Sequence, residues 1–523
     1  MTRQRKENCA VPADARKGVQ TQDFVYLEGG KAIPVNKQTG QLLLPFVTAE
    51  KTAGKLAHAK TRKDADVSAS CSVEEPKAED KKSKSPLGSM KGVIGNLEQA
   101  LKKVTSNKGA PGPDGQTTDY VKEHKEEVIN VLKRQLLSGK YRPGETRRVW
   151  IPKDAGKGMR GLGIPNVTAR IVQEAIRMEL ESIYEPIFHP SSHGFRPNRS
   201  CHSAIKASAK YIREGFRYVV DIDLEKFFDT VCHQRLMASL EIKIKDNSVL
   251  NLINKLLRAG TVMPDGIVVR NEEGVPQGGP LSPLLSNVVL NELDWELSRR
   301  GHKFVRYADD CNIYVKSRKA GERTKASLSK FIERKLRLKV NNDKSAVDLT
   351  GNRHFLGFTL RNNPRKDGVS VYLSEKSRKR AYQKIAKLTP RNWGYSIKFC
   401  IERLNKFIKG WFNFFSITSA REKRTMNFLD GHIRRRLRAI QLKHWKRKRT
   451  VFRKLISIGI KWRVVWKNIY DGRKGIWAQS NTWSVNVAMS NTFFRKSGLI
   501  SLEDLCKEKL KETELPRKRK RRG

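Results

Sequence analysis

The sequence predicts an α+β fold in which an antiparallel sheet is followed by a largely helical region. Short β-branched and aromatic runs flank acidic positions between residues 217 and 315, a pattern typical of paired strands. Beyond residue 396, apolar residues recur at alternating steps of three and four, the spacing of one helical face. With 523 residues, the chain has room for roughly three domains.

The first 87 residues differ in composition from the rest of the chain. Phe24–Leu44 contains short apolar pieces that predict a small hairpin, whereas Lys51–Ser89 is rich in Lys, Ala, Ser and Asp and predicts a flexible linker. No apolar stretch follows the first basic residues, so a secretory signal is not expected. The composition of this extension indicates no function.

A buried strand is expected to end at the first acidic position. In Arg217–Val231 (RYVVDIDLEKFFDTV), the residues Val219, Val220 and Ile222 predict a strand that leads into Asp223. The chain then turns toward two adjacent phenylalanines. Asp223 is therefore expected at a strand tip.

A loop of glycine and proline separates the two acidic positions. This loop, Gly274–Leu285 (GVPQGGPLSPLL), has a bare backbone that another molecule can approach closely. It leads into a helix, for which Ser282 is the expected N-cap, Pro283 the first residue and Gly301 the stop. The apolar stripe of this helix is Leu285, Val289, Leu293 and Leu297.

The second acidic position is the adjacent pair Asp309 and Asp310. The runs Phe304–Tyr307 (FVRY) and Asn312–Val315 (NIYV) on either side predict two strands joined by a tight turn that carries both acids. With Asp223 alongside, three carboxylates would converge, and Mg²⁺ takes such oxygens together with water and phosphates. Taken alone, two adjacent aspartates at a turn are also ordinary turn chemistry.

Two amphipathic helices are predicted in the C-terminal third. The apolar face of the first consists of Ile397, Ile401, Leu404, Ile408, Trp411 and Phe415. The second is expected over Phe428–Arg449, with its inner face formed by Leu429, Ile433, Leu437 and Ile440. Its outer face carries cations that suit a phosphate backbone: Arg434, Arg435, Arg438, Lys443, Lys446 and Arg447. The alternative is a charged helix that is merely solvated.

Composition indicates a polyanionic partner. The chain has 106 Lys and Arg against 53 Asp and Glu, a formal net charge of +53. A membrane surface is the rival partner, but no hydrophobic run approaches the ~18 residues of a spanning helix. The seven cysteines are scattered, without the paired spacing of a zinc site, and fit a reducing compartment, so a cytoplasmic location is expected.

The motifs and their order resemble the reverse transcriptases of group II introns, also called intron-encoded maturases. The resemblance begins at Asn107–Ala110 (NKGA) and continues through Ile151–Lys153 (IPK), Leu162–Pro165 (LGIP) and His193–Ser200 (HGFRPNRS). It runs past both acidic positions to Phe355–Phe358 (FLGF) and covers about half of the chain. Several motifs in the family's order are far more specific than one tetrapeptide.

The resemblance implies a metal site for nucleotide addition. Asp223, Asp309 and Asp310 would be the catalytic, metal-holding residues, with the Leu224 carbonyl as a further oxygen ligand. The implied cofactor is a pair of Mg²⁺ ions, roughly 3.5–4 Å apart in such sites, with Mn²⁺ as a substitute.

The resemblance also implies contacts with the incoming nucleotide. Phe228 would be a steric gate whose ring excludes a 2′-hydroxyl, the alternative being a core phenylalanine. Lys153 and Arg160 would contact the triphosphate, although either could be a solvated charge. Gln277 lies in the loop that matches the nucleotide- and template-contacting segment, and Lys344 matches a lysine near the nucleotide.

The implied architecture is a right-hand polymerase with an α-helical thumb and maturase domain. The expected parts are an N-terminal extension and linker over 1–87, fingers over 88–215, a palm with an antiparallel sheet over 216–362, the thumb over 363–480 and a basic tail over 481–523. Many longer relatives end in an HNH endonuclease, whereas nothing after Trp483 supplies His and Cys at suitable spacing. An endonuclease-lacking member is therefore expected.

The implied activity is RNA-directed DNA synthesis that copies intron RNA for mobility, together with assistance to splicing. The implied partners are intron RNA, an RNA template with a DNA primer, target DNA and deoxynucleoside triphosphates, with no membrane partner. Two alternatives stay open at this point. One is a domesticated reverse transcriptase that acts in DNA repair or phage defence, and the other is a splicing cofactor with dispensable polymerase activity.

Overall fold

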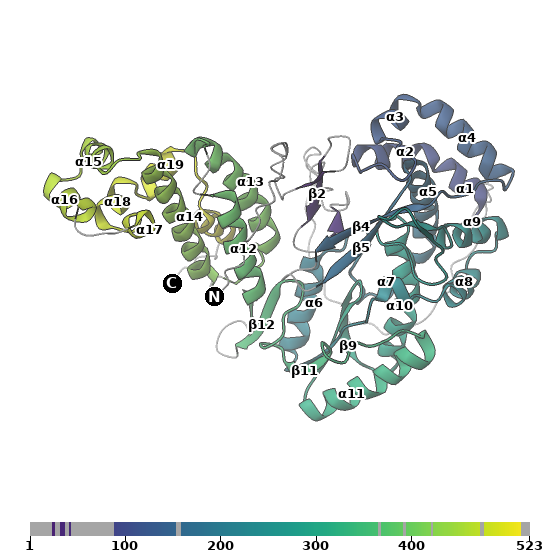
Figure 1. Cartoon of the computed structure of the whole chain (residues 1–523). Helices are drawn as coiled ribbons and strands as arrows, with labels where there is room; N and C mark the ends of the chain where they lie inside the picture. The colour runs from purple at the N-terminus through teal and green to yellow at the C-terminus, as the bar shows by residue number, and fades with distance from the viewer. Residues whose placement is uncertain are drawn as a thin grey trace, which may run out of the picture. The chain divides into compact units, whose positions relative to one another are not determined.

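A computed structural model gives the fold of the chain (Figure 1). It describes residues 24–26, 32–36, 41–42, 88–152, 158–363, 368–390, 394–419, 422–470 and 475–513. The described chain divides into two compact units: unit 1 holds the residues up to Ile187 together with Phe228–Leu285, and unit 2 holds Phe188–Phe227 and everything from Ser286 onward. The borders predicted between fingers, palm and thumb stay predictions, because this division does not test them.

Unit 1 is built from helices around a small sheet. Its sheet has the order β5-β4-β7-β8, in which β4 is antiparallel to β5 and parallel to β7. The strands are β4 (Thr146–Pro152), β5 (Met159–Pro165), β7 (Thr261–Val262) and β8 (Val268–Val269). The helices are α1 (Met90–Gly95), α2 (Leu97–Ser106), α3 (Thr118–Glu123), α4 (Lys125–Leu137), α5 (Val167–Tyr184), α7 (Phe227–Thr230), α8 (His233–Glu241) and α9 (Asn247–Leu257).

The N-terminal extension contributes three short strands. They are β1 (Phe24–Tyr26), β2 (Ala32–Asn36) and β3 (Gln41–Leu42), and they form an antiparallel sheet in the order β1-β2-β3. The hairpin predicted over Phe24–Leu44 is therefore confirmed, with a third strand added. The linker predicted over Lys51–Ser89 lies outside the described residues except for its last two.

The glycine-rich loop of unit 1 packs its backbone directly on strand β5. The amide of Gly163 donates a hydrogen bond of 2.7 Å to the carbonyl of Gln277. At Gly278 the backbone has φ +125°, and a Cβ there would come within 2.3 Å of the Gly163 carbonyl oxygen. Only glycine suits this position, because the conformation is left-handed and the neighbour is backbone.

Unit 2 contains the antiparallel sheet that the sequence predicts. Its strands have the order β11-β6-β10-β9, and every neighbouring pair is antiparallel. The strands are β6 (Tyr218–Ile222), β9 (Lys303–Tyr307), β10 (Asp310–Val315) and β11 (Ala346–Leu349). We call this sheet the palm sheet.

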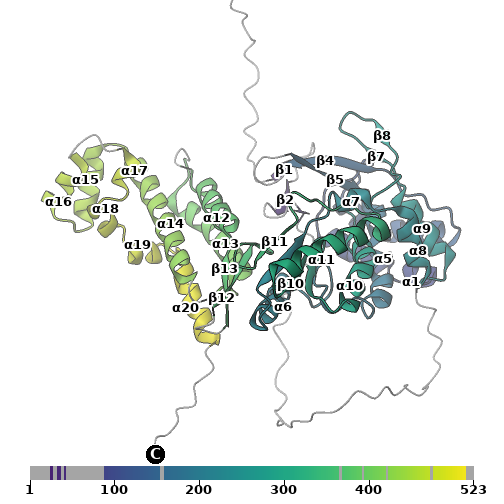
Figure 2. The same ribbon diagram turned by 90° about the horizontal axis from the view of Figure 1, so that it is seen from below.

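Helices cover the two faces of the palm sheet unequally. Helices α10 (Ser282–Arg299) and α11 (Arg318–Phe331) pack on the face of Val220 and Phe304, and α11 continues into a π-helical turn, Ile332–Leu336. Helix α6 (Cys201–Arg213) packs with Val219 and Val305 on the other face. Figure 2 shows α11 running along the palm sheet. The end of the second face remains open beyond α6, because Asp221 and Asp223 are partly exposed.

Helix α10 matches its predicted boundaries closely. It begins at Ser282, whose hydroxyl donates a hydrogen bond of 2.6 Å to the carbonyl of Pro276, and it ends at Arg299. Gly301 follows with φ +74°, the left-handed conformation that commonly ends a helix. Proline and glycine thus define both ends of the helix.

The remainder of unit 2 is a hairpin followed by a helical region, which we call the thumb. The hairpin pairs β12 (Phe358–Asn363) with β13 (Gly368–Leu373). The long helices are α12 (Glu375–Leu388), α13 (Ile397–Phe415) and α14 (Lys423–His444). The shorter helices are α15 (Lys448–Ser457), α16 (Trp462–Tyr470), α17 (Ile476–Gln479), α18 (Trp483–Ala488), α19 (Asn491–Lys496) and α20 (Leu502–Thr513).

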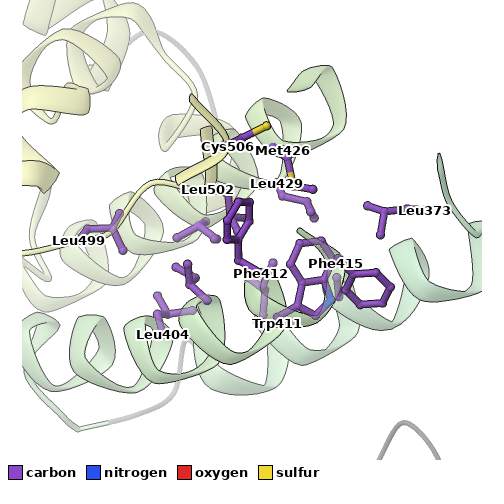
Figure 3. Packing of buried hydrophobic residues seen from close by; sticks show 14 of the residues in the cluster. Leu373, Leu404, Trp411, Phe412, Phe415, Met426, Leu429, Leu499, Leu502 and Cys506 are labelled. Carbon is purple, nitrogen blue, oxygen red and sulfur yellow. The ribbon is translucent and has the colours of Figure 1, made fainter. Parts of the chain in front are cut away.

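The apolar face predicted for the first thumb helix forms the core of this region. Along α13, Ile401, Leu404, Ile408 and Trp411 are buried, and they pack with side chains from α14 and α20 (Figure 3). The last helix, α20, thus packs against both α13 and α14.

No helix in the described ranges is long and apolar enough to cross a membrane. The five cysteines in those ranges are free thiols: Cys201, Cys232, Cys311, Cys400 and Cys506.

Candidate active site

The register of the palm sheet brings the predicted acids together. Cys311 of β10 pairs with Ile222 of β6, so that Asp310 and Asp223, the next residues along each strand, lie beside each other. Asp221 precedes Asp223 by two residues and shares its face, because side chains alternate along a strand. One end of the sheet therefore carries the carboxylates of Asp221, Asp223 and Asp310, with Asp309 in the adjoining turn. We call this end the acidic face.

The turn that carries Asp309 is as tight as the sequence predicts. Tyr307 pairs with Asp310 across β9 and β10, which leaves only Ala308 and Asp309 between the strands. Asp310 is thus the first residue of β10 and not part of the turn. Ala308 has φ +56°, a conformation that costs most non-glycine residues on the order of 1–3 kcal/mol.

Asp223 is held through both its backbone and its side chain. Its amide donates a hydrogen bond of 3.0 Å to the hydroxyl of Ser345, and its carbonyl accepts one of 2.9 Å from the amide of Asn341. Its Oδ2 atom is buried without a hydrogen bond and lies 3.2 Å from the ammonium of Lys344. The structure therefore places Lys344 at the acidic face.

Sequence reasoning missed one member of this group and its partner. Arg353 donates hydrogen bonds from both Nε, at 3.1 Å, and Nη2 to Oδ2 of Asp221, and Nη2 also donates to the carbonyl of Lys344. Burial raises the pKa of Asp221, and Arg353 acts in the opposite direction. The spacing of Asp221 and Asp223, two residues apart on one strand, was the available signal.

The acidic face is electrostatically crowded. Although Asp310 as a whole is exposed, desolvation around its carboxyl group raises its pKa to about 7. The negative charges of Asp309, Asp221 and Asp223 act in the same direction, and Lys344 acts against them. A cation bound here would relieve this repulsion.

The oxygen atoms of the acidic face fit a cation whose coordination is completed by the substrate. Within the described ranges, no group of three or more His, Cys, Asp or Glu side chains is already placed to hold a metal ion. Mg²⁺ does not need such a cage, since it takes one or two carboxylates and completes its shell with water and phosphates. The bridge between Leu224 and Val340 turns the Leu224 carbonyl toward the β10 side of the strand, as a further oxygen ligand would require.

The nucleotide contacts implied by the resemblance fall into both units. Arg160 on β5, Gln277 and Phe228 belong to unit 1, whereas Lys344 belongs to unit 2. Phe228 is half-buried, in contrast to its buried neighbour Phe227, and its carbonyl accepts a hydrogen bond of 2.6 Å from Val275. A partly exposed ring fits a gate better than a core residue. Lys153 lies outside the described residues.

Three of the arginines predicted on the outer face of the basic thumb helix are engaged inside the thumb. Arg438 is buried and donates a hydrogen bond of 3.0 Å to the carbonyl of Met489, and burial lowers its pKa to about 10. The guanidinium of Arg435 lies 4.1 Å from the ring centre of Trp477. Arg434 is half-buried near Asp430, and burial lowers its pKa. The predicted outward position is therefore wrong for Arg438, since helices α17 to α20 cover this side of α14.

The other three predicted cations are exposed. Helix α14 ends at His444, before the predicted end at Arg449, and Lys446 adopts the left-handed conformation, with φ +57°. Lys443, Lys446 and Arg447 all lie on the surface around this break. Among the six predicted cations, the exposed ones thus lie at the C-terminal end of the helix and just beyond it.

Comparison with known proteins assigns a family to each of two stretches of the chain. Residues 151–360 match the family described as reverse transcriptase (RNA-dependent DNA polymerase), and residues 378–456 match the maturase-specific domain of group II introns. Protein YkfC of Escherichia coli is 35% identical over an alignment of 338 positions that covers 57% of this chain and 88% of that protein. The group II intron-encoded protein LtrA of Lactococcus lactis is 33% identical over an alignment of 327 positions that covers 50% of this chain and 54% of LtrA.

A solved structure described as "Partial Cas6-RT-Cas1--Cas2 complex" is 23% identical over 47% of this chain and 42% of that chain. The TM-score of this match is 0.31.

Proposed function

The chain belongs to the group II intron reverse transcriptases and maturases, RNA-directed DNA polymerases that also assist intron splicing, and we propose that Asp223, Asp309 and Asp310 are its metal-holding catalytic residues. Reverse transcriptases use divalent metal ions, and the proposed ions here are two Mg²⁺. The observation that carries the proposal is the strand register, with Asp310 next to Asp223 on one crowded acidic face.

The bound ions would favour loss of the proton from the primer 3′-hydroxyl and neutralise the pyrophosphate that leaves. The chain's own residues prepare this chemistry by position. Asp223 and Asp310 offer oxygens from neighbouring strands, and Ser345 fixes the backbone of Asp223. Lys344, which pairs with Asp223, would donate to a phosphate of the nucleotide when that carboxylate holds a metal ion.

The residues of unit 1 would select and orient the nucleotide. Phe228, a partly exposed residue, would place its ring against C2′ of the incoming sugar and disfavour ribonucleotides. Arg160 would contact the triphosphate, and Gln277, fixed by the hydrogen bond between its carbonyl and Gly163, would contact the nucleotide or template. Each of these roles follows from the family resemblance.

The maturase domain binds intron RNA in this family, and the proposed RNA-facing cations of this chain are Lys443, Lys446 and Arg447. A-form RNA is recognised mainly through its backbone and shape, which suits exposed cations around a helix end. Intron RNA, a primed RNA template, target DNA and deoxynucleotides are the proposed partners. The proposed use of the DNA product is intron mobility.

The test is extension of a DNA primer on an RNA template. Asp309→Ala combined with Asp310→Ala should abolish extension and leave RNA affinity largely intact, because both carboxylates would bind metal ions and not the template. The matched control is Glu126→Ala with Glu127→Ala, which removes two adjacent exposed acids from α4. Normal extension by the aspartate variant would refute the proposed site.

A further inference from the structure

A buried polar network lies on the side of the palm sheet opposite the acidic face. Its centre is Arg306, on β9, whose side chain is 1% exposed, and its members Asp294, Asn287 and Ser192 are also fully buried. We propose that Arg306 is a positioning residue that fixes the turn carrying Asp309 and thereby sets the geometry of the acidic face. This inference rests on the proposed function of that face.

The guanidinium of Arg306 reaches the turn directly. Nη1 donates a hydrogen bond of 2.9 Å to the carbonyl of Ala308 and one of 3.0 Å to Oδ1 of Asn287. Nε and Nη2 donate to the two carboxylate oxygens of Asp294, at 2.7 and 2.5 Å. Nη2 also donates to the hydroxyl of Ser192 at 2.8 Å. The rigid planar fork of arginine is needed to satisfy all these partners at once.

The network fixes the turn to two other elements. Asp294 and Asn287 lie on α10, while Ser192 belongs to the segment before α6 that pairs with β9. The side-chain amide of Asn287 also donates to the carbonyl of Gly194 at 2.9 Å. Arg306, itself bound to a helix and a loop, therefore holds one peptide carbonyl of the turn.

The turn needs such support because its backbone is strained and crowded. Ala308 has φ +56°, a conformation that a residue with a Cβ keeps only when its surroundings impose it. Its amide nitrogen lies 2.3 Å from the position that a Cβ on Gly194 would occupy, so the two backbones are in close contact. Release of the Ala308 carbonyl would let this residue relax and carry Asp309 with it.

Arg306 acts through the turn and not on the substrate. It pairs with Cys311, which pairs with Ile222, and this row of side chains lies on the face away from Asp223 and Asp310. Because the guanidinium is enclosed by protein, it has no path to a nucleotide. Its effect on the reaction must therefore come from the position of the backbone above it.

The test compares Arg306→Lys with a conservative core substitution away from the turn. Lysine keeps the buried charge beside Asp294, but its single ammonium cannot also hold the Ala308 carbonyl, Asn287 and Ser192. The control is Ile385→Val, in the thumb core on α12. Single-turnover nucleotide addition at saturating primer–template gives the rate and the apparent dNTP affinity, and amide hydrogen exchange without metal or nucleic acid reports on the turn.

We expect Arg306→Lys to lower the rate of addition by on the order of 10²-fold with dNTP affinity unchanged, since displacement by about 1 Å has this effect. Exchange should accelerate at residues 307–311 and stay unchanged elsewhere in the palm sheet. Asn287→Ala, which removes one neutral partner, should shift both readouts in the same direction by a smaller amount. It also tests the proposal if Arg306→Lys fails to fold.

A wild-type rate in both variants would overturn the inference. So would a loss that Ile385→Val reproduces, or faster exchange spread over the whole sheet, because each would indicate a general effect on stability. If the unmodified chain extends no primer on RNA, the proposed function fails. The exchange measurement would still decide whether Arg306 holds the turn.

Discussion

The acidic face of the palm sheet and helix α14 of the thumb both hold like charges close together, but they satisfy those charges differently. At the acidic face, desolvation and then the charges of three other carboxylates raise the pKa of Asp310 to about 7. In α14, Arg435 stacks on Trp477, and Arg438 donates to a backbone carbonyl. The arginines are satisfied by the protein, whereas the aspartates remain short of positive charge.

This difference separates a binding site from internal structure. A cluster whose charges are already compensated contributes to folding, and a cluster whose charges repel one another is stabilised by a ligand of opposite charge. The acidic face is therefore expected to bind a cation. In the thumb, the same reasoning moves the proposed RNA-binding surface away from Arg438 to the exposed cations at the end of α14.

The largest effect is expected from removal of one charge at the acidic face. Asp223→Asn keeps the shape of the side chain but removes a proposed metal ligand and the partner of Lys344. Metal ions contribute several kcal/mol of transition-state stabilisation, so the rate of primer extension should fall by roughly 10³-fold or more. The control Asp343→Asn changes an exposed acid in the loop next to Lys344 and should leave the rate unchanged. Equal rates for both variants would remove the distinction between the two acids.

A smaller effect is expected from displacement of the turn without any change in charge. In Gly194→Ala, the new Cβ would lie 2.3 Å from the amide nitrogen of Ala308, so the backbone of the turn must shift. We expect a rate loss of about 10²-fold and a decrease of about 1–3 kcal/mol in the free energy of unfolding. Gly410→Ala on α13 meets no atom within 4 Å and should be neutral or slightly stabilising. A turn that tolerates Gly194→Ala in kinetic assays would show that its position is not critical.

The smallest effect is expected in the thumb. There, loss of exposed cations should weaken RNA binding, whereas loss of a buried cation should lower stability. Neutralising Lys443, Lys446 and Arg447 to Gln should weaken binding to an A-form RNA hairpin, and the log–log salt slope should fall by roughly 0.7–0.9 for each phosphate that is no longer neutralised. Arg438→Gln should instead cost about 1.5–3 kcal/mol of stability, measured by chemical denaturation, with little change in the salt slope. The reverse pattern would mean that Arg438 reaches RNA despite its burial.

The palm could be predicted from the sequence because local patterns determine its parts. The runs on either side of Asp309 and Asp310 define two strands and a two-residue connection, and the structure confirms that hairpin. The structure likewise confirms, as β6, the strand predicted from the apolar run before Asp223. Side chains alternate along paired strands, so a short stretch of sequence is enough to predict which of them share a face of the sheet.

The thumb could be predicted only in part because its packing depends on distant residues. The apolar face of α13 is confirmed, since one helical stripe packs against neighbours on its own side. For α14 the same reasoning assumed a single buried side. Helix α20 lies more than 50 residues further along the chain, and Asp430 on α14 accepts hydrogen bonds from its first residues. No pattern within α14 signals that second covering layer.

Charged partners of the site escaped prediction for a related reason. Arg306 stands beside the acidic turn in sequence, but its function depends on Asp294 and Ser192, which only the tertiary fold brings to it. Arg353 meets Asp221 across 132 positions of the chain. Buried polar networks of this kind depend on long-range geometry, which spacing along a single sequence does not specify.

The most direct test of the proposed active site is the position of the metal ions. Crystals of the protein with a primed RNA template, a nonhydrolysable dNTP and Mn²⁺ would locate the ions by anomalous scattering. We predict Mn²⁺ within bonding distance of the carboxylates of Asp223 and Asp310, with the triphosphate completing the coordination. Mn²⁺ bound elsewhere, with Asp223 still paired only to Lys344, would contradict this prediction.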